Sequence, residues 1–143
     1  MQLGFLGEFN HVVDAKNRLF IPAKFREGLG ETFVIVKPVR GNCLRAYSAD
    51  GWEACLAPLR SMSRKDAEKV MNYYARHAIT VSPDSQGRVV ITSKLLGEAE
   101  IQKDVVILGC NDYVDIWSLE NYNAMVAEED QEELLDILER NGL

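Results

Sequence analysis

The sequence contains few of the residues and patterns that disulfide-rich, metal-dependent or membrane-spanning proteins require. Its 143 residues include three cysteines and two histidines. Cys43, Cys55 and Cys110 form no C-x-x-C pair and have no histidine at zinc-ligand spacing, so we expect no disulfide framework, no metal site and no cofactor. No apolar run approaches the roughly 18–20 residues that span a bilayer, and residues 1–8 lack the basic and apolar segments of a secretory signal. These absences favour a reduced, cytoplasmic protein.

Motifs of the common catalytic classes are also absent. The sequence has no G-x-S-x-G, H-E-x-x-H or P-loop pattern. Gly28-Leu29-Gly30 follows an expected helix rather than a strand, which favours a helix stop over a nucleotide-binding loop. Cys55 lies beside Leu56 on the apolar side of an expected helix, where a core residue is a better interpretation than a nucleophile. We therefore expect that the protein is not an enzyme.

The net charge of −6 is concentrated at the C-terminal end of the chain. Residues 121–143 hold seven acids and one base, whereas the first 120 residues are neutral, with 15 of each. Within the neutral part, two segments are rich in bases: residues 16–26, with Lys16, Arg18, Lys24 and Arg26 and no acid, and residues 60–76, with Arg60, Arg64, Lys65, Lys69 and Arg76 against two acids. We expect an acidic tail on a neutral body, with basic patches that bear on function only if the fold gathers the bases on one face.

The chain also repeats itself at an offset of 70 residues. Asp14 to Arg18 and Asp84 to Arg88 both read D-x-x-x-R, and the offset is held without gaps from Asp14 to Ala57. The offset aligns several identical residues: Ile21 with Ile91, Lys24 with Lys94, Val36 with Val106 and Ser48 with Ser118. Because chance similarity rarely keeps a constant register, we interpret the chain as two copies of one structural unit.

Each copy has the pattern of strand, turn, strand, short helix, strand, turn and strand. Pro22 suits the opening turn of the first short helix, because its missing N–H needs no partner there, and Gly28 and Gly30 are expected to end that helix. Asn17 and Gly87 stand at the two turn tips, where both residue types tolerate the left-handed conformation. The expected strands lie at 5–13, 19–21, 33–36 and 43–47 in the first copy; in the second, strands lie at 79–81, 89–91, 105–108 and 114–117, with a weak helix at 93–96.

The two halves are expected to pair, because neither offers enough cover for its own apolar strands. The expected fold is α+β, mainly β, with a small barrel closed about a pseudo-two-fold axis and both D-x-x-x-R turns on symmetry-related surfaces. The expected units are a first half at residues 5–47, linker helices at 48–75, a second half at 76–119 and an acidic C-terminal helix at 120–143.

Capping residues mark the helices outside the two halves. Asp50 and Glu53 form a D-x-x-E capping box, while Ser63 and Ser118 are expected to cap two further helices. The C-terminal helix carries two apolar patches, separated by the polar segment 128–133. This gap argues against one helix lying on the core throughout, so the final turns are expected to contact a neighbouring subunit or to fray.

Two interpretations of the D-x-x-x-R turns stay open. Asp14 and Arg18 are either an exposed ion pair that fixes the hairpin register, or a carboxylate that orients a guanidinium toward a ligand. The repeat favours the second, because both charged ends of the motif are kept while neighbouring positions differ between the copies. The bases around the first turn would then suit phosphates and guanine edges in the major groove, and the second patch is thinner, with Arg88, Lys94 and the amide of Gln86.

At these residues the sequence resembles the MraZ family, bacterial transcription regulators of the AbrB-like (SpoVT-AbrB) superfamily. Residues 7–26, GEFNHVVDAKNRLFIPAKFR, resemble its first signature, and residues 84–91, DSQGRVVI, resemble its second. The resemblance covers nearly the whole chain, including the linker and the acidic C-terminal segment. There are two departures: Asn17 stands where the family usually has glycine, which the turn tolerates, and Thr92 stands where the first copy has Pro22, which is expected to weaken the second short helix.

The resemblance implies a fold and a mode of action. The fold would be a double-ψ-like, swapped-hairpin barrel of two ββαββ AbrB-type halves within one chain. Subunits of the family assemble head to tail into closed rings, here expected to hold about eight to twelve copies. They bind direct repeats in the promoter of their own operon, the division and cell-wall cluster, which implies a nucleoid-associated repressor. The family's DNA contact, the D-x-x-x-R motif, carries over to Asp14 with Arg18 and to Asp84 with Arg88.

These inferences predict a protein that binds double-stranded promoter DNA as a homo-oligomer, without a membrane or a small-molecule substrate. Asp14 and Asp84 are expected to orient the arginines, and the residues expected to contact DNA are Arg18, Arg88, Lys16, Asn17, Gln86, Lys24, Arg26 and Lys94. The alternative is a non-catalytic protein-interaction ring in which the D-x-x-x-R ion pairs are purely structural. Salt separates the two, because DNA binding by lysine and arginine weakens steeply as salt rises, whereas apolar docking does not.

Overall fold

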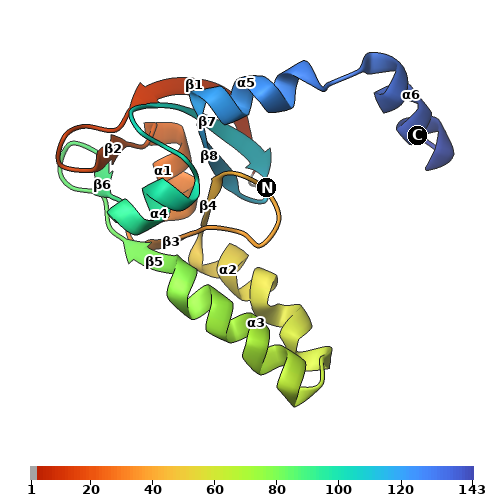
Figure 1. Ribbon diagram of the computed structural model, residues 1–143, viewed down its shortest axis with the longest axis horizontal. Helices are drawn as coiled ribbons and strands as arrows, with labels where there is room; N and C mark the ends of the chain where they lie inside the picture. Colours follow the sequence, from red (N-terminus) through yellow and green to blue (C-terminus); the bar gives the residue numbers. More distant parts are fainter. Residues whose placement is uncertain (1–2) are drawn as a thin grey trace.

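The computed structural model describes residues 3–143, whose strands and helices alternate in the order that the repeat predicts (Figure 1). The first copy comprises β1 (Phe5–Val12), β2 (Arg18–Phe20), α1 (Ala23–Leu29), β3 (Phe33–Val36) and β4 (Leu44–Tyr47). The second copy comprises β5 (Ala78–Val81), β6 (Arg88–Val90), α4 (Ser93–Glu98), β7 (Asp104–Asn111) and β8 (Val114–Ser118). Outside the copies lie α2 (Ala49–Leu56), the 3-10 helix η1 (Ala57–Ser61), α3 (Arg64–His77), α5 (Leu119–Ala127) and α6 (Gln131–Arg140). Each copy therefore has the expected ββαββ order.

The strands of the two copies are interleaved rather than kept in separate sheets. One antiparallel sheet has the strand order β1-β7-β8-β4-β3-β5, and a second sheet consists of β2 and β6 alone. β1 pairs with β7, β4 with β8, and β2 with β6, so each of these contacts joins one copy to the other. The two halves therefore pair as expected and share one fold.

The strands do not close into one barrel through a continuous ladder. Within residues 3–143 the hydrogen-bonded strands form sheets of six and two strands, and an isolated bridge joins Val13 to Leu19. The reason is the shortness of β2 and β6, which run for three residues each before the chain enters α1 and α4. The observed fold class is α+β, with the six-stranded antiparallel sheet as its largest element.

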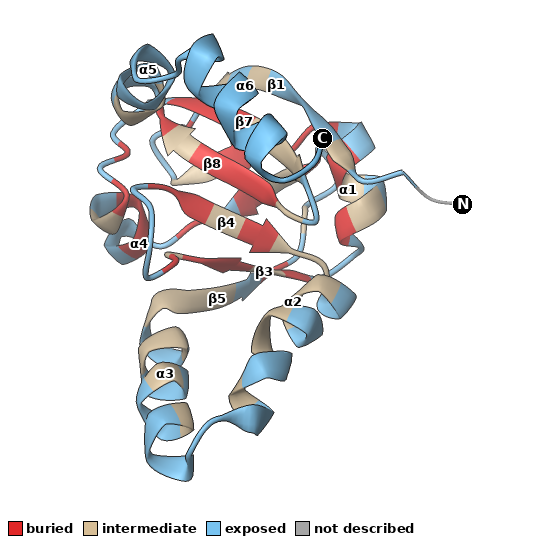
Figure 2. Ribbon diagram, turned by 90° about the vertical axis from the view of Figure 1, so that its right-hand side faces the viewer, coloured by how far each residue is buried: buried red, intermediate tan, exposed pale blue. Residues whose placement is uncertain are grey.

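The core lies between the large sheet, the β2–β6 pair and helices α1 and α4. Phe25 of α1 is fully buried and receives the ring edges of Phe5 and Phe9, at centroid separations of 6.0 and 5.3 Å. Leu19 and Val89, equivalent in the repeat, face each other across β2 and β6 and are both buried. Figure 2 shows that buried residues follow β7, β8, β4 and β3, whereas α2, α3 and α6 contain none. The core is therefore built jointly by the two copies.

An ion pair with a buried carboxylate and a partly buried guanidinium lies where the two copies meet in the large sheet. Arg45 of β4 and Asp115 of β8 are equivalent in the 70-residue repeat and face each other in the β4–β8 register. Nε and Nη2 of Arg45 donate to the two carboxylate oxygens over 2.7 and 3.3 Å, and the guanidinium lies 3.8 Å from the centroid of the Tyr113 ring. Burial alone would lower the pKa of Arg45, but the hydrogen bonds and the charge of Asp115 outweigh it and raise that pKa. The arginine therefore remains charged inside the sheet.

Serine side chains begin three of the helices outside the copies. Ser63 and Ser118 cap α3 and α5 as predicted, each accepting from a backbone N–H three residues ahead. The predicted Asp50–Glu53 capping box is wrong, because α2 is capped by Ser48, whose Oγ accepts from the N–H of Gly51 over 3.0 Å. β4 ends directly before Ser48, which leaves its hydroxyl at the entrance of the helix and places the acid inside the first turn.

The short helices α1 and α4 differ from the expectations in two details. Thr92 supports α4 rather than weakening it, because its Oγ1 accepts from the N–H of Leu95 over 3.3 Å. Pro22, at the equivalent position before α1, makes no side-chain capping bond. At the far end of α1, Gly30 has φ 93° and ends the helix as predicted, whereas Gly28 lies inside the helix. A threonine before α4 thus satisfies a free helix N–H that proline leaves open.

The acidic C-terminal segment forms two helices instead of the single helix predicted for residues 120–143. α5 ends at Ala127 and α6 begins at Gln131, with the polar residues 128–130 between them. Figure 1 shows α5 lying against the body and α6 projecting away from it. None of the helices in residues 3–143 is long and apolar enough to cross a membrane. The polar gap therefore separates a helix on the body from one that leaves it.

Candidate nucleic-acid interface

The first D-x-x-x-R turn is held by one carboxylate. Oδ1 of Asp14 accepts hydrogen bonds from the backbone N–H groups of Lys16 and Arg18, both over 2.9 Å, and Oδ2 accepts from Nε of Arg18 over 2.7 Å. Asn17 stands at the tip in the left-handed region, with φ 61°, as predicted. The same side chain therefore fixes both the backbone of the turn and the direction of the guanidinium.

The second turn repeats this arrangement almost atom for atom. Oδ1 of Asp84 accepts from the N–H groups of Gln86 and Arg88, both over 2.9 Å, and Oδ2 accepts from Nε of Arg88 over 3.0 Å. Gly87 takes the tip position, with φ 79°. The exposed fractions of the two arginine side chains agree closely, at 30% for Arg18 and 29% for Arg88. The two copies thus present two guanidiniums that are braced in the same way.

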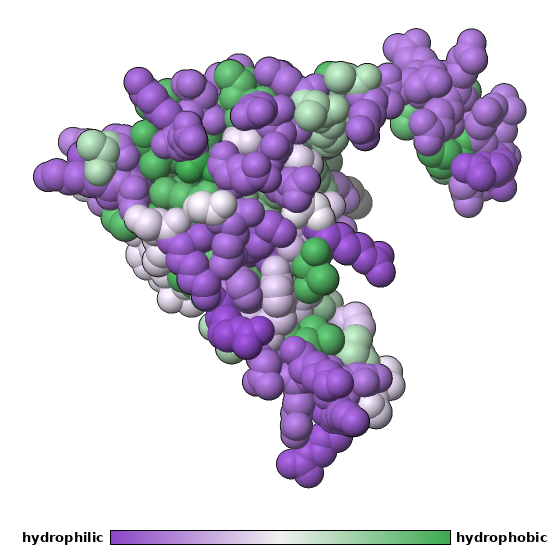
Figure 3. Space-filling model, in the orientation of Figure 1, coloured by the Kyte–Doolittle hydropathy of each residue, from purple (hydrophilic) through white to green (hydrophobic). Residues whose placement is uncertain are grey.

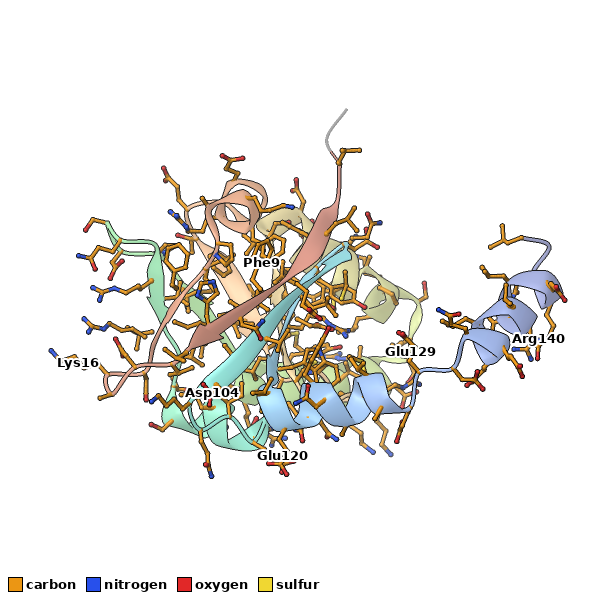
Figure 4. All side chains as sticks on the ribbon, turned by 90° about the horizontal axis from the view of Figure 1, so that it is seen from above. Phe9, Lys16, Asp104, Glu120, Glu129 and Arg140 are labelled. Atoms are coloured by element: carbon orange, nitrogen blue, oxygen red, sulfur yellow. The ribbon has the colours of Figure 1, made fainter. Side chains whose placement is uncertain are left out.

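Strands β2 and β6 join the two turns, which lie at opposite ends of their short antiparallel ladder. Their antiparallel register places Arg18 and Arg88 on neighbouring strands. The N–H that follows each strand donates to the carbonyl at the tip of the other turn: Ile21 to Gly87 and Ile91 to Asn17, each over 2.9 Å. The pair of turns is therefore one rigid unit made from both copies. It lies at one end of the long axis of the molecule (Figure 1), and Figure 4 shows Lys16 reaching outward there.

One residue that supports this unit was not identified from the sequence. Ser93, the first residue of α4, accepts a hydrogen bond on Oγ from Nδ2 of Asn17 over 2.9 Å. The two residues are 76 positions apart and belong to different copies, so no local pattern indicates the contact. The signal present in the sequence is a polar residue at the start of α4 where the first copy has Ala23.

Arg26 lies beside the second turn, whereas the sequence grouped it with the first. Its Nε donates to the carbonyl of Ile21 over 2.8 Å, and its guanidinium carbon lies 5.5 Å from the centroid of the Phe20 ring. A Cβ added at Gly87 would stand 2.7 Å from the same carbon, so the side chain packs closely against that turn. The pairing of β2 with β6 explains this position, because it carries the start of α1 to the turn of the other copy.

The two equivalent lysines, Lys24 and Lys94, are engaged outside the turns. Nζ of Lys24 lies 5.8 Å from the centroid of the Phe9 ring in β1. Nζ of Lys94 donates to the carbonyl of Arg76, near the end of α3, over 2.6 Å. The basic patch expected from residues 16–26 is therefore smaller than the sequence indicates. The fold brings together the two motif pairs, Lys16, Asn17, Gln86 and Arg26.

Hydrogen bonding keeps both motif carboxylates ionised. The pKa of Asp14 lies below its ordinary value of 3.8, chiefly because the N–H of Arg18 donates to it, with further hydrogen bonds from the Arg18 side chain and the Lys16 N–H. The pKa of Asp84 is lowered in the same way by Arg88 and Gln86. A carboxyl whose pKa is lower in the folded protein stabilises the fold above its unfolded pKa, and this contribution is lost as the pH falls through the folded value. Both carboxylates are therefore ionised and hydrogen-bonded to their turns at neutral pH, and their contribution to stability is lost only below about pH 4.

Replacing Arg18 by alanine is expected to leave the pKa of Asp14 below 3.8, because the largest cause of its lowering is a backbone N–H that the substitution keeps. Carbon-detected NMR of the carboxyl groups between about pH 2 and pH 6 measures both titrations. Asp84, whose partner Arg88 is untouched, serves as the internal control. A midpoint for Asp14 that rises to the value of an unfolded peptide would show that the guanidinium, and not the turn backbone, controls this carboxylate.

The acidic part of the chain lies at the opposite end of the molecule from the turns. Figure 4 places Lys16 at one end and Arg140 at the other, with Glu129 between α5 and α6. Residues 128–140 hold seven acids, whereas residues 16–26 hold none. An anionic ligand that approaches the turns therefore meets the paired arginines without passing the acidic helices. Within residues 3–143, no group of three or more histidine, cysteine, aspartate or glutamate side chains is placed to hold a metal ion.

Comparison with known proteins is consistent with the repeat and the turns. The family model described as "MraZ protein, putative antitoxin-like" matches residues 5–72 and again residues 74–142. A protein of Pelotomaculum thermopropionicum is 40% identical over 141 residues, which cover 93% of this chain and 97% of that protein. A protein of Acetivibrio thermocellus is 40% identical over 127 residues, covering 87% and 88%, and one of Alkaliphilus oremlandii is 42% identical over 125 residues, covering 84% and 87%.

All three relatives are named transcriptional regulator MraZ. These names describe regulators and not enzymes, which confirms the prediction that the chain is not an enzyme. The family model matches twice, once on each copy of the sequence repeat, so the match and the fold describe the same duplication. The chain belongs to the MraZ protein family, as its two D-x-x-x-R signatures predicted.

Proposed function

We propose that this protein regulates transcription by binding double-stranded promoter DNA through its paired D-x-x-x-R turns. The proposal rests on an arrangement that occurs in both copies. Arg18 and Arg88 each donate through Nε to the carboxylate of their own turn, and the two arginines lie on adjacent strands. This arrangement directs the terminal nitrogens of each guanidinium to phosphate oxygens or to O6 and N7 of guanine. The names of the relatives, transcriptional regulators of the same family, support this function.

The side chains around the arginines fit a supporting role in DNA binding. Lys16 and Gln86 occupy the same position in the two turns, where an ammonium and an amide suit contacts with phosphates. The side chains of Asn17 and Arg26 are each held beside the two turns by a hydrogen bond within the protein. The two lysines that are engaged outside the turns are not part of the proposed contact.

Assembly would give weak individual sites useful affinity. We propose head-to-tail closed rings of about eight to twelve copies, because linked patches gain avidity without new contacts. Direct repeats about 10 base pairs apart would keep successive patches on one face of the duplex. The proposed target is the promoter of the protein's own division and cell-wall operon, which it represses as a cytoplasmic, nucleoid-associated protein.

The salt dependence of binding tests the proposal directly. The affinity for a promoter duplex should fall by about a hundredfold between about 50 and 200 mM salt, if roughly four phosphates are neutralised. Fluorescence anisotropy of a labelled duplex measures the affinity at each salt concentration. A duplex of unrelated sequence is the control, and it should bind more weakly throughout.

The alternative function is a protein-interaction ring in which the motif pairs are purely structural. One observation favours it: each motif carboxylate already accepts two backbone N–H groups, which is a structural role in itself. A surface that docks other proteins through apolar contacts would respond little to salt. DNA binding that is absent, or that does not change with salt, would contradict the proposal and favour this alternative.

A further inference from the structure

The outer face of the β2–β6 pair carries apolar side chains as well as the two arginines. The middle residue of each three-residue strand is buried, and successive residues of a strand point to opposite sides, so the first and third residues point outward. β2 contributes Arg18 and Phe20 to the outer face, and β6 contributes Arg88 and Val90. Figure 3 shows hydrophobic atoms among hydrophilic ones at this end of the molecule, where Figure 1 places β2, β6 and their turns.

The two apolar side chains differ in how far they are covered. Phe20 is half-buried, with the guanidinium carbon of Arg26 at 5.5 Å and the centre of the His11 ring at 5.2 Å from its ring centroid. Val90, at the equivalent position of the repeat, is 60% exposed. The position equivalent to Arg26 is taken by Leu96, which is buried in the core. The second copy therefore leaves an apolar side chain open to solvent where the first copy covers one.

The exposed valine lies beside an arginine of the turns. The antiparallel register places Val90 directly opposite Arg18. Side chains that face each other in such a pair have Cβ atoms about 4.5–5.5 Å apart, and diagonal neighbours such as Arg18 and Arg88 lie about 7–8 Å apart. A ligand that meets the guanidinium of Arg18 therefore also meets the methyl groups of Val90, with the second guanidinium close by.

This combination of side chains fits the major groove of DNA. The groove admits a two-stranded β-ribbon, and arginine recognises O6 and N7 of guanine there. The apolar group that base pairs present in the major groove is the C5-methyl of thymine, whereas the minor groove presents none. Cytosine offers an amino group at the corresponding edge and no methyl group. A guanidinium beside an exposed valine therefore matches a guanine or phosphate beside a thymine.

We propose that Val90 contacts the C5-methyl group of a thymine when the paired turns bind DNA. The contact adds a preference for thymine to the preference for guanine that the arginines supply. Val90 is then a residue that determines the sequence specificity of the protein, and the covered Phe20 is not. This inference rests on the DNA binding proposed above and assigns one base-specific contact within it.

Replacing every thymine of the promoter duplex by deoxyuridine tests the contact, because it removes the C5-methyl groups and keeps the phosphates and the hydrogen-bonding groups. The wild-type protein should bind the deoxyuridine duplex at least about fourfold more weakly, the factor expected for one methyl group that is no longer buried. Val90→Ser, whose side chain has no methyl group, should bind the thymine duplex more weakly by a similar factor and should bind both duplexes with nearly the same affinity. Fluorescence anisotropy measures the four affinities.

The same substitution at another exposed valine provides the matched control. Val39 is 66% exposed in the loop between β3 and β4, so Val39→Ser should keep the full preference for the thymine duplex, and circular dichroism should show that both variants are folded. If the wild-type protein binds both duplexes equally, or if Val90→Ser loses as much affinity on deoxyuridine as the wild-type protein does, the valine contact is wrong while the proposed DNA binding stands. If the wild-type protein binds neither duplex, both are wrong.

Discussion

Replacing Arg18 by alanine should lower the affinity of the protein for its promoter duplex by about a hundredfold, and replacing Arg88 as well should abolish specific binding. Each substitution removes a guanidinium whose direction is set by a neighbouring carboxylate, with Nε–Oδ2 distances of 2.7 and 3.0 Å. Because these carboxylates are exposed and keep their backbone hydrogen bonds, the variants should melt at nearly the wild-type temperature. Gel shifts and anisotropy with a duplex that carries the direct repeats measure the loss.

Two matched variants separate base recognition from charge. Arg18→Lys keeps the positive charge but lacks the planar fork, so it should retain salt-dependent binding to any duplex and lose the preference for the promoter. Arg40→Ala removes an exposed arginine from the loop between β3 and β4 and should bind as the wild-type protein does. Promoter binding that is unchanged in Arg18→Ala would exclude the first turn from the DNA contact.

The two turns can be predicted from the sequence because their chemistry is local. Asp14 and Arg18 are four residues apart, and the residue between them at the tip, Asn17, adopts the left-handed conformation that the turn requires. The repeat extends the same prediction to the second copy, where Gly87 takes the tip. The order of strands and helices follows equally from patterns within a few residues of each other. The turn and the order of strands and helices within each copy can therefore be predicted from the sequence of that copy.

The side chains around the turns cannot be predicted in this way, because they cross between the copies. Arg26 is eight residues from Arg18 in the sequence, yet it packs against Gly87 of the other copy. Lys24 lies on the Phe9 ring of β1, although its position in the chain groups it with the first turn. The pairing of β2 with β6 decides which bases remain at the turns, and no pattern within one copy specifies that pairing.

The same exchange of strands brings together two residues of opposite charge. Arg45 and Asp115 are equivalent in the repeat and face each other between β4 and β8. In a symmetric pair of identical halves this position would face itself, and like charges opposite each other in a sheet are unfavourable. A single chain with two copies can carry different residues there. The ion pair is therefore a contact that the duplication makes possible and that holds the two copies in register.

Replacing Arg45 by alanine is expected to lower the free energy of unfolding by about 3–5 kcal/mol. The substitution leaves the carboxylate of Asp115, whose side chain is 6% exposed, without the guanidinium that donates to both of its oxygens. It also removes the cation that lies 3.8 Å from the ring centroid of Tyr113. Urea unfolding of the full chain measures the loss, at one fixed protein concentration because assembly would change the apparent stability.

Two comparisons test whether the loss comes from the unpaired carboxylate. The double variant R45L/D115L removes both charges, so it should recover most of the stability, as apolar replacements of buried ion pairs often do. Arg18→Ala breaks an Nε–carboxylate bond of the same 2.7 Å length, but at the exposed first turn, and should change the free energy of unfolding far less. If Arg45→Ala unfolds at the wild-type urea concentration, the pair does not hold the two copies together. If the double variant is as unstable as Arg45→Ala, the lost packing of the guanidinium, and not the buried charge, causes the effect.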